Sequence, residues 1–232
     1  MKKMILSVVM VALAALGRAG EPAAAPKSEW LPSFTAVKVD GPLDITFVRV
    51  PDTEAPKIVY DTKGSYTTKF RAEVRDKVLV IRERPDARRP ERTSVTVRYN
   101  DLKNIDIMRA AATFEGVLDM PMLDLTVSDG GKFTAAMNVP DLRAVVSDQS
   151  VVTITGTVRY LTLTLSSGRF DAVGAECLSA RVYAQSKGEA LLDVTDRLEA
   201  RTTTGGTIRY KGNPPILRIE ERFMAGDVKP LE

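Results

Sequence analysis

The chain has 232 residues, of which 44% are hydrophobic and 27% are charged, so it can form one or two domains with a buried core. The formal net charge is only +3, and no stripe of basic and aromatic residues accompanies it, so we expect no nucleic-acid partner. Histidine is absent, which removes the commonest general base near neutral pH and every histidine-dependent nucleophile.

Residues 1–20 are predicted to be an export signal. Two lysines precede an apolar run at 4–16, and Gly17-Arg18-Ala19 resembles a cleavage site. The run is shorter than the ~20 residues that span a bilayer, and a retained anchor is the alternative. No cysteine lies directly after the run, so a lipoprotein is not expected. We therefore expect the protein in the periplasm, at the outer-membrane surface or in the medium.

Residues 21–29 are rich in alanine and proline and are expected to be a flexible spacer. Residues 30–100 then alternate apolar and polar positions in short runs, which is typical of strands with one buried face. Apolar runs at 70–74 and 78–81 predict a hairpin over residues 75–77. We expect residues 30–100 to form a β-sheet portion that caps one end of the remainder.

Residues 101–232 repeat with a period near nineteen. An aliphatic anchor recurs, and the residues two and four places after it are apolar or small, as in strands with one buried face. The anchors are Ile105, Leu123, Leu142, Leu161, Leu178, Leu198 and Leu217. This period predicts an all-β fold, a right-handed single-stranded β-helix or solenoid, in which the anchors stack as an internal ladder and each coil is covered by its neighbours.

Each coil is expected to contain two strands joined by a small polar corner. Glycine tolerates positive φ there, and serine or aspartate can hydrogen-bond to the bent backbone. The expected corners lie at 128–131, 147–150, 166–168, 185–188 and 203–206, and the second strands are marked by Phe114, Phe133, Val152, Phe170 and Ile208. Counted between anchors, the coil that holds Cys177 is two residues short, which predicts an irregular corner.

The order of these patterns resembles the bacterial family described as putative auto-transporter adhesin, head GIN domain, over residues 34–228. The resemblance is carried by Phe34-x-x-Val37-x-Val39-x-Gly41, by the hairpin end at 78–81, by the recurring Leu-x-Leu-x-x-Ser-x-Gly text, and by the ending at 208–214. Two corners depart from the family's Ser-Gly-Ser-Gly pattern. The resemblance implies an exported β-solenoid, and it supplies no functional residues.

Two candidate sites follow from the repeat. Asp129 and Asp148 occupy equivalent corner positions, so their carboxylates are expected ~5 Å apart, where they could cap turns, bind a cation or act as an acid–base pair. Capping is the interpretation that we favour. Arg181, Tyr183 and Arg201 are expected to lie together on an outward face, with Arg201 next to Arg181, and to form a weak binding patch.

The segment 82–92 contains five arginines and three acids. It is expected to be a solvated loop, with docking of anionic glycan or lipid head groups as the alternative. Cys177 is the only cysteine and is expected to be a plain buried thiol.

The function expected from these features is an exported, non-enzymatic β-solenoid that binds a glycan or a protein partner at the cell envelope. One alternative is a carboxylate-dependent enzyme that acts on polysaccharides, and another is a structural envelope protein without a ligand. No cofactor is expected. Flat sheet faces and exposed edges could pair copies of the chain into homo-oligomers.

Overall fold

The computed structural model describes residues 25–63, 69–88, 91–221, 224 and 226–231. Within these ranges all regular structure is β, and no helix capable of crossing a membrane occurs there. The predicted export signal lies outside the described residues. The strands are β1 (Lys27–Trp30), β2 (Ala36–Asp40), β3 (Leu43–Arg49), β4 (Lys57–Asp61), β5 (Phe70–Arg75), β6 (Val78–Glu83), β7 (Thr93–Tyr99), β8 (Asn104–Met108), β9 (Ala111–Asp119), β10 (Met122–Ser128), β11 (Lys132–Ser147), β12 (Val151–Ser166), β13 (Arg169–Gln185), β14 (Glu189–Thr202), β15 (Thr207–Lys211), β16 (Ile216–Glu221) and β17 (Asp227–Pro230).

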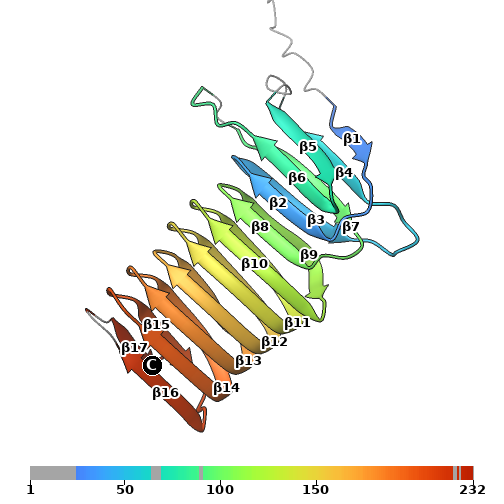
Figure 1. The fold of residues 1–232 in the computed structure, drawn as a ribbon. Helices are drawn as coiled ribbons and strands as arrows, with labels where there is room; N and C mark the ends of the chain where they lie inside the picture. The colour runs from blue at the N-terminus through green and yellow to red at the C-terminus, as the bar shows by residue number, and fades with distance from the viewer. Residues whose placement is uncertain (1–24, 64–68, 89–90, 222–223, 225, 232) are drawn as a thin grey trace, which may run out of the picture.

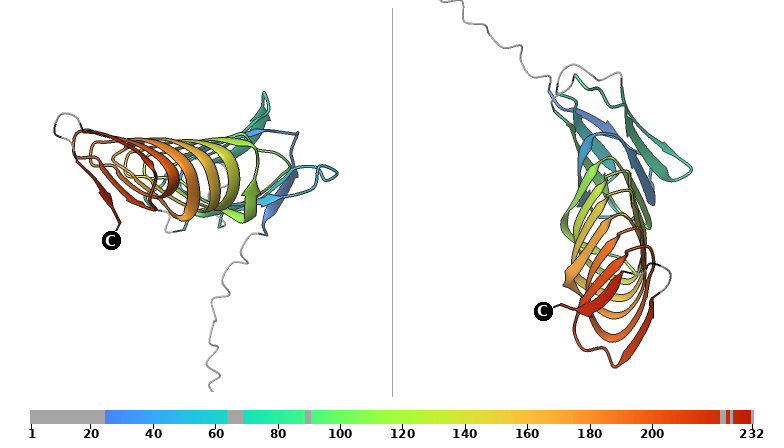
Figure 2. Two further views of the ribbon diagram at one scale, coloured as in Figure 1. Left: turned by 90° about the horizontal axis from the view of Figure 1, so that it is seen from below. Right: turned by 90° about the vertical axis from the view of Figure 1, so that its left-hand side faces the viewer.

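These strands wind into a flattened tube with two long faces (Figures 1 and 2). Face A consists of β6, β2, β8, β10, the second halves of β11 to β14, and β16, paired in parallel. Face B consists of β7, β3, β9, the first halves of β11 to β14, β15 and β17. Each long strand bends from one face to the other. The predicted β-solenoid is confirmed.

The predicted internal ladder forms along face A. Leu123 pairs in register with Leu142, which pairs with Leu161, and all three are buried. Leu198 continues the ladder and pairs with Leu217 in the last coil. The ladder belongs to a single hydrophobic core that runs from Leu31 to Val228.

Two of the predicted anchors, Leu178 and Ile105, are each displaced by two residues from the register of the ladder. Ala180, not Leu178, pairs with Leu161, and Leu178 is 41% exposed. The cause is a bulge in β13 between Ala172 and Glu176, so the next strand of face A begins later. The predicted irregular corner of this coil is confirmed separately, because the corner at 166–168 is one residue shorter than the corner at 147–150 and has one left-handed residue instead of two.

At the start of the repeat, Ile105 pairs with Leu125 and Val37 rather than with Leu123. On face B, Phe133, Val152 and Phe170 share one register as predicted. Phe114 does not join them, because Ala112 occupies that position. Its ring instead stacks on Phe47 with centroids 4.7 Å apart.

The polar corners are confirmed, and each contains a left-handed residue. Asp129, Asp148, Ser167, Ser186 and Thr204 have φ between 47° and 56°. This left-handed region is tolerated best by short polar residues and glycine. The corner amides also bond to the next coil, as the amide of Gly130 donates to the carbonyl of Asp148 at 2.8 Å. The corners therefore stack along the tube as well as turning the chain.

The N-terminal portion is more than a cap. β2 lies between β6 and β8, and β3 lies between β7 and β9. The order of the coils in the sequence therefore differs from their order along the tube. The coil of β2 and β3 comes first in the sequence, but in space it lies between the coil of β6 and β7 and the coil of β8 and β9. Residues 30–100 and the repeats are therefore parts of one continuous sheet.

The cap itself is antiparallel. β5 pairs with β6 through the predicted hairpin, while β4 pairs with β7 and β1 pairs with β4. Because β1 spans Lys27–Trp30, the expectation that residues 21–29 are all flexible spacer is wrong for its last three residues.

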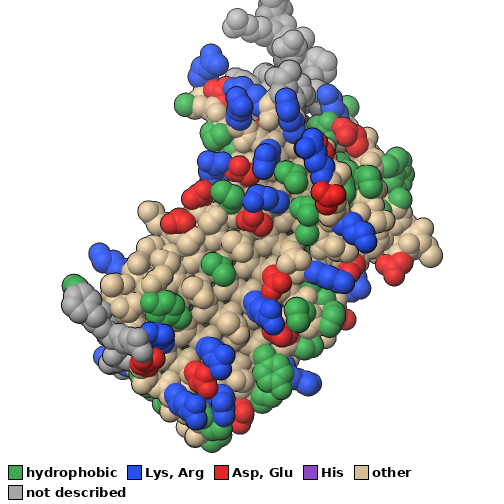
Figure 3. All heavy atoms as spheres, viewed as in Figure 1, with side chains coloured by type: hydrophobic (Ala, Val, Ile, Leu, Met, Phe, Trp, Pro, Cys, Tyr) green, Lys and Arg blue, Asp and Glu red, His purple; other side chains and the backbone are tan. Residues whose placement is uncertain are grey.

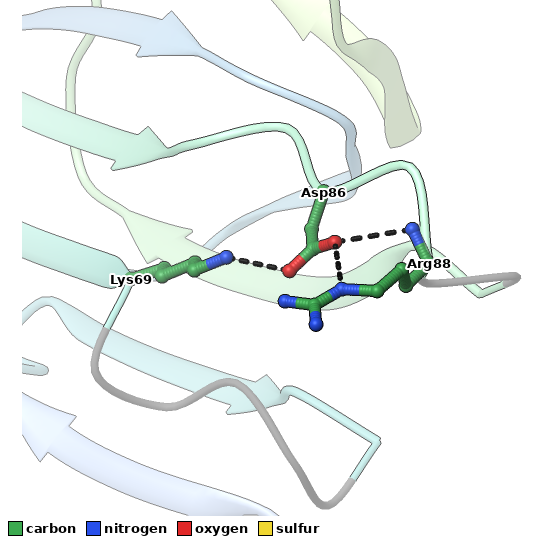
Figure 4. Close-up of polar contacts among 3 residues, drawn as sticks. All are labelled: Lys69, Asp86 and Arg88. Atoms are coloured by element: carbon green, nitrogen blue, oxygen red, sulfur yellow. Dashed lines mark hydrogen bonds and ion pairs between the residues drawn. The ribbon is translucent and has the colours of Figure 1, made fainter.

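The loop between β6 and β7 is anchored at its base by Asp86 (Figure 4). Its carboxylate accepts hydrogen bonds from Nζ of Lys69 at 2.6 Å and from the amide of Arg88 at 3.0 Å. These donors, Lys69 first, hold the pKa of Asp86 well below its usual range. Further along, Arg92 donates to the carbonyl of Leu43 at 2.8 Å. Arg88 and Arg92 of this loop therefore form hydrogen bonds within the protein.

Replacing Gly156 by alanine should destabilise the protein strongly. Gly156 has φ +104°, and an added Cβ would lie 2.2 Å from the carbonyl oxygen of Met137 in the neighbouring coil. We expect Gly156→Ala to lower the free energy of unfolding by about 3 kcal/mol or more, measured by chemical denaturation. The control Gly116→Ala, at φ +79° with open space around it, should cost about 1 kcal/mol. Equal losses would contradict this close contact.

The thiol of Cys177 should resist modification until the protein unfolds. It is fully buried between Val158 and Val194, and burial, with Asp193 and Glu176 adding to it, raises its pKa to about 12. A thiol reagent at pH 8 should react only in denaturant. Because the folded pKa lies above the ordinary 9.0, the stability from the neutral thiol is full below pH 9 and falls as pH rises towards 12. Between pH 8 and pH 10.5 the wild type should lose more stability than Cys177→Ala, and parallel losses would contradict the assignment.

Candidate functional site: a charged groove on the last coils

The outer surface of face A carries a shallow groove of about 430 Å³ over its last coils. Side chains alternate along a strand, so the outward residues of paired strands form rows across the face. The first row is Thr162, Arg181, Glu199 and Arg218, and the second row is Thr164, Tyr183, Arg201 and Glu220. Lys or Arg and Asp or Glu side chains lie intermixed over these coils (Figure 3).

Glu199 is the centre of the first row. Nε of Arg181 donates to its carboxylate at 2.9 Å, and Nη1 of Arg197 and Nη1 of Arg218 lie 3.2 and 3.7 Å from it. The hydrogen bond from Arg181, followed by the charges of all three arginines, lowers the pKa of Glu199. Three guanidinium groups surround one carboxylate, and two of them, those of Arg181 and Arg218, line the groove, so positive charge exceeds negative charge around Glu199.

The second row combines an aromatic ring with an ion pair. The guanidinium carbon of Arg201 lies 5.3 Å from the centroid of the Tyr183 ring, a cation–π distance. Its Nε lies 3.6 Å from a carboxylate oxygen of Glu220. The Tyr183 hydroxyl donates to Gln185 at 3.0 Å. The ring and the guanidinium are therefore held against each other on the open face.

The structure places the three predicted patch residues, Arg181, Tyr183 and Arg201, in this one groove. Their expected order is wrong, because Arg201 pairs with Tyr183 and the neighbour of Arg181 is Glu199. The error comes from the anchor at Leu178. With Ala180 as the anchor, Arg181 and Glu199 both follow their anchors by one residue, and sequence reasoning would have found their pairing.

The other predicted pair, Asp129 and Asp148, lies in adjacent corners with φ of 52° and 54°. The hydroxyl of Ser147 donates to the Asp148 carboxylate at 2.6 Å. The left-handed backbone and the hydrogen bond from Ser147 are both consistent with residues that stabilise turns. Across the described part of the chain, no three side chains of histidine, cysteine, aspartate or glutamate converge in a way that could hold a metal ion.

The fold defined here is a β-solenoid with an antiparallel cap and a charged groove near its far end. A family model described as "Putative auto-transporter adhesin, head GIN domain" matches residues 33–214, and the chain belongs to that family. The resemblance stated from the sequence motifs is therefore confirmed.

Solved structures of proteins from Bacteroides and Parabacteroides species share this fold. A putative adhesin from Bacteroides fragilis has a TM-score of 0.78 at 16% identity, covering 89% of this chain and 96% of that one. A putative adhesin from Parabacteroides merdae has a TM-score of 0.67 at 18% identity, and a putative lipid binding protein from Parabacteroides distasonis has 0.67 at 15%; each covers 90% of this chain and 96% of its own. At these identities the likeness concerns the fold alone. No curated protein matches the chain.

The carboxyl group of Glu199 should titrate below its ordinary pKa of 4.5, because Arg181 stabilises the ionised form. Following the side-chain carboxyl by NMR, we expect Arg181→Gln to move the midpoint up towards 4.5. The control Arg143→Gln removes a guanidinium from face A that does not contact Glu199 and should leave the midpoint unchanged. An unchanged midpoint in Arg181→Gln would contradict the assigned hydrogen bond.

Proposed function

We propose that this protein is an exported, non-enzymatic binding module of the cell envelope, and that the groove of face A holds its ligand. The observation that carries the proposal is the excess of arginine around Glu199 on an open, hydroxyl-bearing sheet surface. Membership of a family named for adhesins supports a role in binding. The apolar N-terminal run supports export.

The chemistry of the groove favours an acidic glycan as the ligand. Arginine matches a carboxylate in bidentate geometry, and the side chain of Arg181 is 73% exposed and can reach an added anion. Thr162 and Thr164 present hydroxyl groups beside it, which can bond to sugar hydroxyls. Tyr183 adds an aromatic surface. A protein segment rich in carboxylates is the second kind of partner that this surface suits.

The arrangement of the groove does not favour glycoside hydrolysis within it. Such enzymes need one carboxyl group with a raised pKa as the general acid. The arginines lower the pKa of Glu199 instead, so it is ionised at neutral pH. Its side chain is suited to orienting arginines rather than to donating a proton.

Binding should depend on Arg181 and on salt. We expect Arg181→Gln to weaken binding to an acidic oligosaccharide, identified from a glycan array, by about tenfold, because a charge-assisted hydrogen bond is lost. The control is Arg75→Gln, at the opposite end, where Arg75 is 74% exposed and also ion-paired to a glutamate. It should bind as the wild type does, and added salt should weaken the wild type.

A lack of binding to every member of a broad panel of acidic glycans and envelope proteins would contradict the proposal. Protease treatment of intact cells tests the location separately. A chain that faces outwards is cleaved on intact cells, whereas a periplasmic chain is cleaved only after the outer membrane is opened.

A further inference from the structure

The C-terminal end of the tube finishes in two edge strands. β16 pairs with β14, and β17 pairs with β15; no described strand covers the far side of either. Leu217 and Ile219 continue the inward rows of face A, yet they are 42% and 45% exposed, since no coil among the described residues lies over them. An open strand edge beside exposed apolar side chains is a template for pairing with another strand.

The two edges differ in their capacity to pair. β17 has only four residues, and two of them are Lys229 and Pro230. Both disfavour pairing with a further strand, because proline has no amide hydrogen to donate and the charge of lysine is costly to bury. β16 has six residues and no proline. β16 is therefore the edge strand at this end of the tube that is able to pair with a further strand.

We propose that β16 pairs antiparallel with β16 of a second copy of this chain, about a two-fold axis at Ile219. Residues opposite each other in an antiparallel pair share a face, and opposite charges there are favourable. A register centred on Arg218 would oppose two arginines, and one centred on Glu220 would oppose two glutamates. Centring on Ile219 places Arg218 opposite Glu220 of the partner subunit, twice, and brings the two Ile219 side chains together over the exposed core.

The rows of the groove support the same register. The first row reads Arg181, Glu199, Arg218 across β13, β14 and β16. In the dimer it would continue with Glu220 of the partner subunit and then Arg201 of the partner subunit, so the charges alternate without interruption. Arg218 and Glu220 also line the groove, so the second copy would extend the groove across the axis.

Dimerisation needs no ligand, since β16 alone forms the pairing, although its Arg218 and Glu220 also line the groove. A failure to dimerise would leave binding by one copy intact, and a failure to bind glycan would leave the dimer intact. The two proposals are thus tested by separate measurements.

A cysteine at the axis gives the sharpest test. In the proposed register Ile219 faces itself, and opposed Cα atoms in an antiparallel pair lie about 4.5–5.5 Å apart, within the range of a disulfide. The full-length chain with Ile219→Cys should form a covalent dimer under mild oxidation, because the native Cys177 is buried and does not compete. The matched control is Val145→Cys, at a residue that is 47% exposed and outward on β11, away from the edge. It should stay monomeric on a non-reducing gel.

The mass in solution gives the second test. Light scattering should show a dimer of the wild-type chain, and Arg218→Glu or Glu220→Arg alone should weaken it about tenfold by opposing like charges. The double variant restores opposite signs and should dimerise better than either single variant, with folding checked by circular dichroism. A monomer at all concentrations, open-ended larger assemblies, or cross-linking of Ile219→Cys no faster than Val145→Cys would each overturn the proposal.

Discussion

Parallel pairing between successive coils is the interaction on which this structure depends. A single coil cannot bury its own apolar side chains, so each is covered only by the coils before and after it. The ladder through Leu123, Leu142 and Leu161 exists because backbone hydrogen bonds hold those strands in register. The same bonds stack the polar corners, where Asp129 and Asp148 adopt the same left-handed conformation.

The pairing also dictates the outer surface. Once the register is set, each outward side chain lies one strand spacing, about 4.8 Å, from its equivalent in the next coil. The groove is a consequence of this rule, because it brings Glu199 between Arg181 and Arg218 and sets Arg201 against Tyr183. Where the pairing stops, at β16, the inner ladder and a strand edge are both exposed. The groove and the open edge of β16 therefore have one physical origin.

The N-terminal portion shows that this rule does not require coils to follow one another in sequence. β2 and β3 form an inner coil, and the outermost coil of β6 and β7 is added to them later in the chain. Phe47 of the inner coil contacts Tyr99 of β7 on one side and Phe114 of β9 on the other. The antiparallel strands β1, β4 and β5 then cover the end.

The sequence by itself determined the β-solenoid, the polar corners, the hairpin at 75–77 and the buried Cys177, because alternation and turn chemistry are local properties of the chain. It also placed Arg181, Tyr183 and Arg201 on one outward surface. Only the tertiary structure decided the coil order at the N-terminus, the replacement of Leu178 by Ala180 in the ladder, and the contact between Arg181 and Glu199. The reason is that register across a bulge is set by hydrogen bonds between strands distant in sequence, and a shift of two residues keeps the same alternation while changing every neighbour.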